Sequence, residues 1–367
     1  SKRARKVHAY TTLIAGWLWA EHLYLNGEVS FPWLLLGNGF AGDVWAVQWY
    51  ELTGVLGGSL WVLLVNILLF EWLTNRSNKG AGIAATIFMV VPIVASLIIG
   101  ASYEENTNTQ RATVTLIQPN FDPYKEKYTL PVEEQLNILS ELVSEAPEDA
   151  DYIVLPETVI GDAGDPIWES NHLGSRSVGA LERLRSLRYP DAQLITGAMT
   201  YHRYKNEQEA SATARHRGSM WYDRYNAALA LDRDSTLKVS HKSRLVVGVE
   251  KMPFMDILKP LEKLIVNLGG TTGQLGVDKY RRSFLLRTSR HPYGVQAAAP
   301  ICYESVYGEH FAGFTADGAQ LMMVITNDGW WHDTEGYRQH FSYSRLRAIE
   351  TRRWVCRAAN TGISGFI

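Results

Sequence analysis

Cysteine is nearly absent from this sequence, since Cys302 and Cys356 are the only two among 367 residues. A scaffold held by several disulfides is therefore excluded, one bridge stays open, and cysteine usage does not identify the compartment. An excess of one charge is also lacking, because 36 basic side chains face 38 acidic ones. This balance gives no electrostatic reason to expect a nucleic-acid partner. Internal repeats and glycine-rich phosphate loops are missing too.

Charge is missing altogether from two stretches in the first part of the chain, residues 52–70 and 80–103. At about 1.5 Å rise per residue, each matches the roughly 30 Å core of a bilayer. The alternative is a pair of buried core helices, which is disfavoured because such helices rarely run so long without a charge. A shorter apolar run at residues 7–20 is a weaker candidate for a span.

Basic residues predict the orientation of these spans. They cluster at residues 2–6 and 76–79, and both clusters are expected on the cytoplasmic side. The aromatic-rich loop 21–51 and everything after about residue 106 then lie outside the cytoplasm. The loop is either an interfacial anchor or a lipid-access surface. We expect a membrane region at residues 1–106 and a globular domain at 107–367, with the chain truncated at both ends.

The globular part is predicted to be α/β, because short apolar segments alternate with segments of helical spacing. Helices are expected at residues 132–146 and 342–353. Strands are expected at residues 112–117, 152–155, 193–196, 226–231, 295–301 and 321–326.

Three residues lie at the ends of these apolar segments, where α/β enzymes tend to place their chemistry. Glu157 follows a strand and a proline, and partial desolvation is expected to raise its pKa toward that of a general base. Lys242 lies in a basic cluster leading into a strand and is suited to hold an oxyanion. Cys302 ends a strand at an expected helix start, which favours a thiolate. Taken singly, each is more simply explained as a surface glutamate, a solvated basic face or a buried structural cysteine.

In this order and spacing, the three residues resemble the Glu–Lys–Cys arrangement of the nitrilase superfamily. The resemblance covers residues 112–367 and implies an α-β-β-α sandwich, here preceded by transmembrane helices. It also implies that Glu157 is the general base, Lys242 stabilises the oxyanion and Cys302 is the nucleophile. No cofactor and no metal are implied, and His340 has no partner at metal-ligand spacing.

Other motifs narrow the resemblance to the apolipoprotein N-acyltransferase family. These motifs are Trp19-Ala20-Glu21-His22, Phe31-Pro32-Trp33-Leu34, Tyr222-Asp223-Arg224-Tyr225-Asn226, Thr326-Asn327-Asp328-Gly329-Trp330, Arg338-Gln339-His340-Phe341, Arg347-Ala348-Ile349-Glu350 and Asn360-Thr361-Gly362-Ile363. By this resemblance Glu250 supports acylation, Tyr303 and Glu304 flank the nucleophile, and Asn327 and Tyr128 are candidate substrate contacts. The family commonly has Pro-Phe-Gly-Glu where this chain has Val247-Gly248-Val249-Glu250, so the context of Glu250 departs from the pattern.

The resemblance implies a multi-pass protein of the bacterial inner membrane with its catalytic domain in the periplasm. The implied reaction transfers an acyl chain from a phospholipid, through a Cys302 thioester, to the α-amino group of a diacylated apolipoprotein. One alternative is a membrane-anchored amidase or carbamoylase that uses water as acceptor. A second alternative is a catalytically inactive binding or transport module.

Overall fold

The computed structural model describes residues 2–103, 111–127, 129–161, 164–232, 237–254 and 274–367. Contacts divide the chain into two compact units. The first consists of Ser1–Thr109, Val306–Glu309 and Ser342–Arg352, and the second consists of Gln110–Ser305, His310–Phe341 and Arg353–Ile367. The two short segments near residues 306 and 342 were not expected to group with the membrane region.

The first unit is built on three long helices, α1 (Lys2–Asn26), α2 (Tyr50–Thr74) and α3 (Lys79–Ser102). Helices α2 and α3 have mean hydropathies of 2.0 and 2.5, and both are long and apolar enough to cross a membrane. Only 22% and 11% of their apolar windows are buried within the described structure. Apart from Tyr103, the two helices contain both uncharged stretches, and the expected pair of long apolar helices is confirmed.

A series of short turns joins α1 to α2. It contains the 3-10 helices η1 (Pro32–Leu34), η2 (Leu36–Phe40) and η3 (Val44–Ala46). The Glu21 carboxylate accepts a hydrogen bond from the N–H of Leu36 at 2.9 Å, and the Tyr50 hydroxyl donates to the carbonyl of Gly37 at 3.0 Å. The large side chains of Leu34 and Trp45 remain exposed. Such a pattern is typical of chain at the level of lipid headgroups.

The second unit contains two sheets. The first has strand order β1-β2-β4-β6-β5, with β3 paired to β4 and β7 paired to β6; the second has the order β12-β11-β10-β9-β8. The strands of the first sheet are β1 (Val114–Leu116), β2 (Tyr152–Val154), β3 (Ile167–Trp168), β4 (Gln193–Tyr204), β5 (Arg215–Arg217), β6 (Met220–Leu231) and β7 (Leu237–His241). Those of the second are β8 (Ser283–Leu286), β9 (Val295–Ala298), β10 (Leu321–Thr326), β11 (Val355–Ala359) and β12 (Gly365–Phe366).

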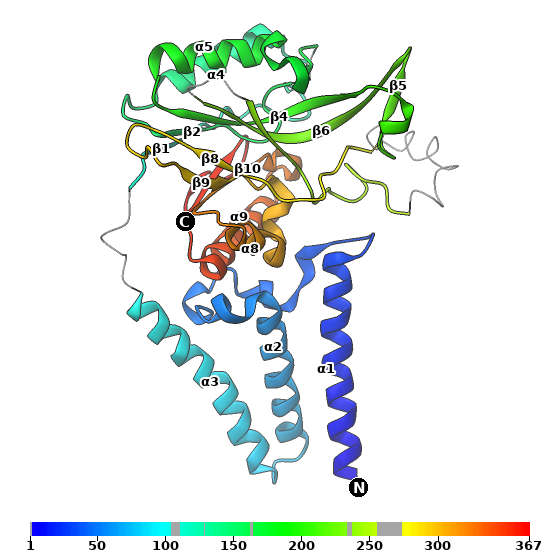
Figure 1. Cartoon of the computed structure of the whole chain (residues 1–367). Helices are drawn as coiled ribbons and strands as arrows, with labels where there is room; N and C mark the ends of the chain where they lie inside the picture. The colour runs from blue at the N-terminus through cyan, green and yellow to red at the C-terminus, as the bar shows by residue number, and fades with distance from the viewer. Residues whose placement is uncertain (1, 104–110, 128, 162–163, 233–236, 255–273) are drawn as a thin grey trace. The chain divides into compact units, whose positions relative to one another are not determined.

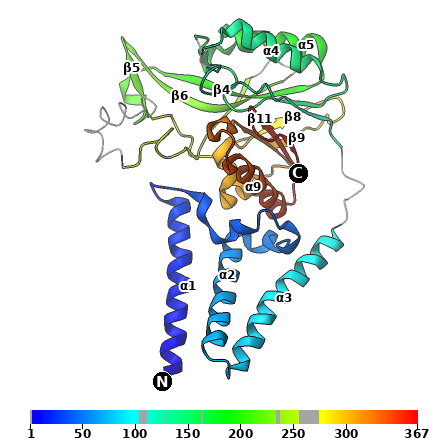
Figure 2. The ribbon, with the colours of Figure 1, turned by 180° about the vertical axis from the view of Figure 1, so that it is seen from behind.

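Helices cover the outer faces of the two sheets. Figure 1 shows α4 (Val132–Ser144) and α5 (Arg176–Arg188) on one face of the first sheet and the second sheet on the other. Helix α8 (Gly308–Ala316) and the beginning of α9 (Glu335–Thr351) lie beyond the second sheet, and the reverse view has the same order of layers (Figure 2). The short 3-10 helices of this unit are η4 (Glu169–Gly174), η5 (Glu207–Glu209), η7 (Cys302–Val306) and η8 (Asp328–Trp331). The expected nitrilase-like α/β sandwich is confirmed.

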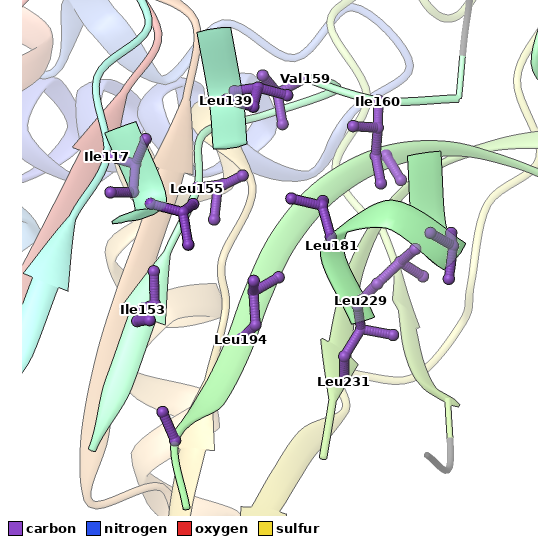
Figure 3. Packing of buried hydrophobic residues seen from close by; sticks show 14 of the residues in the cluster. Ile117, Leu139, Ile153, Leu155, Val159, Ile160, Leu181, Leu194, Leu229 and Leu231 are labelled. Atoms are coloured by element: carbon purple, nitrogen blue, oxygen red, sulfur yellow. The ribbon is translucent and has the colours of Figure 1, made fainter. Parts of the chain in front are cut away.

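A hydrophobic core fills the space between the first sheet and its helices. Figure 3 shows Leu139 of α4 and Leu181 of α5 packed over Ile153, Leu194 and Leu229 from three strands. Side chains alternate between the two faces of a strand. Residues 227, 229 and 231 of strand β6 belong to this core. The even-numbered residues of β6 therefore point to the opposite face of the sheet, toward the second sheet. That face carries the candidate site.

Candidate functional site

Glu157 lies just beyond the end of β2, where the chain turns against β4. The N–H of Gly197 in β4 donates to the carbonyl of Pro156 at 3.0 Å, and the N–H of Val159 donates to the carbonyl of Gly197 at 3.1 Å. A Cβ at position 197 would lie 2.5 Å from the Cα of Glu157. Only glycine therefore allows this close approach, which holds Glu157 at a fixed and almost buried position with 6% exposure.

Three groups donate hydrogen bonds to the Glu157 carboxylate. Its Oε1 accepts from Nδ2 of Asn226 at 2.8 Å and from Nζ of Lys242 at 3.0 Å, while its Oε2 accepts from the N–H of Asn327 at 3.0 Å. Burial raises the pKa of Glu157, but the charges of Lys242 and Lys127 and the hydrogen bonds from Asn226 and Lys242 outweigh burial, so the pKa lies below its ordinary value. The expectation of a raised pKa was wrong, because it included burial and omitted the partners.

Lys242 follows β7 and is 1% exposed. Its N–H donates to the carbonyl of Asn226 at 2.8 Å, and its Nζ lies 3.0 Å from Glu157 and 2.9 Å from Glu250. Burial lowers the pKa of Lys242, but the two carboxylates raise it well above the ordinary value. The reading as a solvated basic face is excluded. The expectation that Lys242 leads into a strand was also wrong, since the strand precedes it.

Glu250 completes this cluster despite its unusual sequence context. Its Oε1 accepts from Nδ2 of Asn226 at 3.0 Å and from Nζ of Lys242, and its Oε2 accepts from the N–H of Val246 at 2.9 Å. Gly248 has φ of 85°, a conformation that glycine adopts without strain, and its N–H donates to the carbonyl of Lys251 at 2.7 Å. The turn from residue 246 to 251 thus returns Glu250 to the lysine eight positions earlier.

Cys302 begins the short helix η7, directly after a bridge between Ile301 and Ile325 of β10. Its φ is 49°, and the residue is 7% exposed. Burial raises the pKa of the thiol strongly; the charge of Glu157 adds to this effect, while Lys242 and a hydrogen bond with Thr326 oppose it. The expectation of a favoured thiolate was therefore wrong for the resting protein. Glu157 and Lys242 nevertheless both act electrostatically on this thiol, and their side chains lie 3.0 Å from each other.

Glu304 ties the nucleophile loop to the lysine loop. Its Oε1 accepts from the N–H and the hydroxyl of Ser243 at 2.8 and 2.6 Å, and its Oε2 accepts from the N–H of Ile301 at 2.8 Å. Burial raises the pKa of Glu304, but His310, Ser243 and Ile301 lower it to about 2. Glu304 thus connects the residue after Lys242 to the residue before Cys302. Tyr303, between Cys302 and Glu304, is buried.

The remaining predicted residues have different outcomes. Asn327 lies in the site through its main-chain bond to Glu157, and its Nδ2 is buried with no hydrogen-bond partner in the described part of the chain. Tyr128 lies outside the described residues. Nearby, the exposed ring of Tyr124 stacks on His332 at 4.6 Å and meets Trp330 edge-on at 5.4 Å.

Two polar residues at the site were not predicted as members. Asn226, on the inner face of β6, donates to both Glu157 and Glu250. The sequence signal for Asn226 was its position as a polar amide at the start of an apolar run, residues 226–231, that is typical of a buried strand. Lys127 is buried beside the site, donates to the Thr158 hydroxyl and contributes to lowering the pKa of Glu157. Nothing in its local sequence separates Lys127 from surface lysines.

The described residues offer no set of side chains that could bind a metal ion. They contain no group of three or more His, Cys, Asp or Glu side chains placed to hold a metal ion. The arrangement instead offers a buried thiol, a carboxylate able to take its proton and a cation beside both. A thiol, a base and a cation in this arrangement are typical of covalent acyl transfer.

The chain is similar to known proteins over both of its parts. The sequence model of the carbon-nitrogen hydrolase family matches residues 113–366, and that of the apolipoprotein N-acyltransferase N-terminal domain matches residues 2–68. A curated apolipoprotein N-acyltransferase of Chlorobaculum tepidum is 31% identical over 360 residues, covering 96% of this chain and 65% of the relative. One of Rickettsia typhi is 27% identical over 375 residues, covering 99% and 66%. The chain thus spans just under two thirds of the length of these relatives.

Solved structures with a similar backbone are more distant in sequence. A nitrilase-superfamily member of Saccharomyces cerevisiae has a TM-score of 0.41 and 16% identity, covering 70% of this chain and 78% of its own. A CN-hydrolase superfamily protein of Xanthomonas campestris has a TM-score of 0.44 and 14% identity, covering 69% and 77%. The family match, which extends over more than half of the residues, decides the assignment. This chain belongs to the carbon-nitrogen hydrolase family.

Proposed function

We propose that the chain is part of an apolipoprotein N-acyltransferase. In this proposal, residues 1–106 are its membrane region and residues 107–367 are its catalytic domain, on the periplasmic side of a bacterial inner membrane. The observation that carries the proposal is the buried cluster of Glu157, Lys242 and Glu250, in which Glu157 and Lys242 act electrostatically on the Cys302 thiol. The first residues of the same chain match the apolipoprotein N-acyltransferase N-terminal domain. A soluble hydrolase would have no use for two apolar helices ahead of such a site.

The first half-reaction forms a thioester. Glu157 takes the proton of the Cys302 thiol, and the thiolate attacks the ester carbonyl of a phospholipid. Two N–H donors of Lys242 are engaged by Glu157 and Glu250 in the described structure, and the third serves the oxyanion together with the N–H of Tyr303. One such donor contributes a factor of roughly 10² to 10³ in rate. The carbon–oxygen bond then breaks, and Glu157 returns its proton to the departing lysophospholipid oxygen.

The second half-reaction uses the amine of the diacylated apolipoprotein. Glu157, again unprotonated, takes a proton as the amine attacks the thioester carbonyl. The carbon–sulfur bond breaks, the amide forms, and the sulfur receives the proton from Glu157. The side-chain Nδ2 of Asn327, whose main-chain N–H binds Glu157, has no hydrogen-bond partner among the described residues and is the donor we assign to the substrate. Exclusion of water from this buried site prevents hydrolysis of the thioester.

Glu250 keeps the lysine charged throughout this cycle. When Glu157 is protonated, Lys242 would otherwise be a buried cation without a carboxylate, which is costly. The second carboxylate, 2.9 Å away, remains in place. This gives Glu250 a role even though it touches neither the thiol nor the proton in transit.

Mass spectrometry of the peptide that contains Cys302 tests the proposal. Incubation with phospholipid alone should add one acyl mass to Cys302, and a diacylated peptide should then remove it as an N-acyl product. Glu157→Gln should slow acylation by about 10² to 10⁴-fold, and Cys302→Ala should abolish it. Cys356→Ala, in buried strand β11, is the control and should acylate normally.

Each failure of this experiment has a distinct meaning. Acyl mass retained in Cys302→Ala would remove the assigned nucleophile. Release of free fatty acid in place of N-acyl peptide would establish water as the acceptor and a hydrolase as the function. No acyl mass on wild-type Cys302 would contradict a phospholipid donor.

A further inference from the structure

The hairpin formed by β4, β5 and β6 extends beyond the rest of the first sheet (Figure 1). Asn226 of β6 donates to Glu157 and Glu250, and its side chain therefore points toward the candidate site. Because alternate residues of a strand point to the same face, Arg224 and Tyr222 share the face of Asn226. One face of the hairpin thus begins at the site and continues outward along β6.

Three further arginines lie on this face. Residues directly opposite each other in neighbouring strands point to the same side of a sheet. Arg203 of β4 and Arg215 of β5 are both opposite Tyr222, and Arg217 lies two positions after Arg215 in β5. Together with Arg224 they form what we call the arginine face. None of the described hairpin positions that share this face carries an acidic side chain.

The buried carboxylate of the hairpin lies on the other face. Asp223 is completely buried and accepts hydrogen bonds from the hydroxyl groups of Tyr204 at 2.6 Å and Thr213 at 2.9 Å. The Ser211 hydroxyl donates to the same carboxylate. The hydrogen-bond partners of Asp223 in the described structure are thus hydroxyl groups, and the hairpin separates its carboxylate from its guanidinium groups.

Aromatic rings support the arginine face. The rings of Trp168 and Tyr201 lie 5.3 Å apart, and those of Tyr201 and Tyr222 lie 6.1 Å apart. The guanidinium carbon of Arg224 lies 5.6 Å from the centre of the Tyr201 ring. Burial lowers the pKa of Arg215, and the charge of Arg224 lowers it further. Guanidinium groups that disfavour each other's charge in this way are stabilised by a bound anion.

The arginine face borders the catalytic cluster. Met199 of β4 is opposite Asn226 in the ladder. Leu275 packs in one apolar cluster with Met199 and Tyr201, and its N–H donates to the carbonyl of Glu250 at 3.1 Å. The same short segment of chain therefore contacts a catalytic carboxylate residue and the beginning of the arginine face.

A phospholipid donor requires a cation near the site. Its phosphodiester is joined to the reacting ester by only a few bonds of the glycerol, so this anion lies close to the site whenever the ester does. Two residues of a strand span about 7 Å, which is the separation of Arg224 from Asn226 along β6. Burying the anion without a cation would cost binding free energy. The long side chain of Arg224 is within reach, and its planar guanidinium group pairs with two phosphate oxygens at once.

We propose that the arginine face binds the phosphodiester of the acyl donor, with Arg224 nearest the reacting ester. This inference deepens the proposed function and rests on it for the identity of the donor. One competing interpretation is that Arg224 only stabilises the hairpin. Another is that the arginine face binds an acidic segment of the apolipoprotein.

The test is the single-turnover acylation of Cys302 in the purified membrane protein by two esters. A phospholipid carries the phosphodiester, whereas p-nitrophenyl butyrate is an ester without any phosphate. Arg224→Gln should raise the half-saturating phospholipid concentration by about 10- to 100-fold, because one charge-assisted contact is lost. Its maximal rate with phospholipid and its reaction with p-nitrophenyl butyrate should stay as in wild type. Arg183→Gln removes the same charge from an exposed position of α5 and is the control that should match wild type throughout.

The competing interpretations give different results. If Arg224 only stabilises the hairpin, reaction with both esters should slow to the same extent, in step with the folded fraction. If the arginine face binds an acidic segment of the apolipoprotein, only the half-saturating concentration of the diacylated peptide should rise. Either result, or an unchanged phospholipid dependence, would overturn the proposal.

A second variant covers the case in which Arg224→Gln does not fold. Arg203 is exposed, so its replacement by glutamine should leave the fold intact. Arg203→Gln should raise the half-saturating phospholipid concentration by about threefold. No change in this variant would reject the inference.

Phosphorus NMR separates this inference from the proposed function. Wild type in a phosphate-free detergent should broaden the signal of sn-glycerol 3-phosphate, and Arg224→Gln should not. Absence of broadening by wild type would reject the anion site. If wild-type Cys302 takes no acyl group from phospholipid, the proposed function fails, and this binding measurement still decides whether the arginine face holds a phosphate.

Discussion

Lys242 is shared by two carboxylates, and this sharing explains several properties of the site. One cation faces the two anions Glu157 and Glu250 at 3.0 and 2.9 Å. Asn226 bridges the same two oxygens, at 2.8 and 3.0 Å. A neutral amide there lowers the repulsion between the carboxylates without adding charge. Transfer of the thiol proton to Glu157 therefore moves negative charge from one neighbour of Lys242 to another.

Buried carboxylates with low pKa values predict acid sensitivity. Glu304 and Asp328 have ordinary pKa values of 4.5 and 3.8 and folded values of about 2. As the pH falls, these two carboxylates bind protons in the unfolded chain before they do so in the folded protein. The stability that they contribute to the folded state is therefore complete above about pH 4.5 and is lost as the pH falls toward 2. The shift of Glu304 alone corresponds to roughly 3 kcal/mol.

Thermal unfolding between pH 7 and pH 3 measures this effect. The wild type should lose stability steeply below about pH 4.5, and Glu304→Gln should start lower and have a shallower dependence. Glu148→Gln, at an exposed position, is the matched control and should follow wild type. A wild-type unfolding temperature that does not change across this range would contradict the assignment.

At the scale of elements, the close contact between β4 and the loop after β2 places the general base. Substitution of Gly197 by alanine would put a Cβ 2.5 Å from both the Cα of Glu157 and the carbonyl oxygen of Pro156. Because these are backbone atoms, the loop must move. We expect Gly197→Ala to destabilise the protein by about 1–3 kcal/mol and to reduce Cys302 acylation as Glu157 is displaced.

Chemical unfolding and the acylation assay test this prediction together. The control is Gly179→Ala in α5, where the nearest atom to a new Cβ is 3.9 Å away. Replacing a helical glycine should stabilise the protein by roughly 0.5–1 kcal/mol. Wild-type stability and activity in Gly197→Ala would show that the loop is not held as described.

Helix α2 of the first unit has a kink at Gly54 that leaves a backbone amide without its helical hydrogen bond. Gly54 has φ of 60° and ψ of −171°, which interrupts the helix. The N–H of Val55 then donates to Oε1 of Glu350 at 3.1 Å, and Glu350 also pairs with the buried Arg347 at 2.9 Å. A carboxylate from the end of α9 thus satisfies an amide that the helix itself leaves open. This contact explains why Ser342–Arg352 groups with the first unit.

At the scale of the whole molecule, the two apolar helices predict a topology. Arg76 and Lys79 lie at the junction between α2 and α3, and basic residues favour the cytoplasmic side. Alkaline phosphatase is a reporter that becomes active only after export from the cytoplasm. Fused after residue 110, it should therefore be active. The same reporter fused between α2 and α3 should be inactive.

A fluorescent protein that folds only in the cytoplasm provides the complementary measurement. It should be dark after residue 110 and bright between α2 and α3. Fluorescence at both positions would mean that the chain does not cross the membrane. The inverse pattern would place the catalytic domain in the cytoplasm and exclude a periplasmic acceptor.

The sequence by itself determined the features that depend on local pattern. The uncharged runs predicted α2 and α3, and alternating apolar segments predicted the α/β layers, because periodicity is a property of neighbouring residues. Two of the strand predictions were too short: β4 and β6 continue to Tyr204 and back to Met220. The ends of these strands, residues 202–204 of β4 and 222–225 of β6, are polar and aromatic, so their hydropathy did not mark them as strand.

Only the tertiary structure decided the electrostatics. Glu157, Lys242, Asn226 and Asn327 come from four separate segments, and the net direction of each pKa depends on which of them meet. Burial alone was foreseeable for Glu157 and Cys302, but the partners that reverse or reinforce its effect lie far away in the chain. The same holds for His340, whose contacts to Cys302 and Asp328 arise where α9 packs beneath the second sheet. Long-range contacts set free energies that local sequence does not encode.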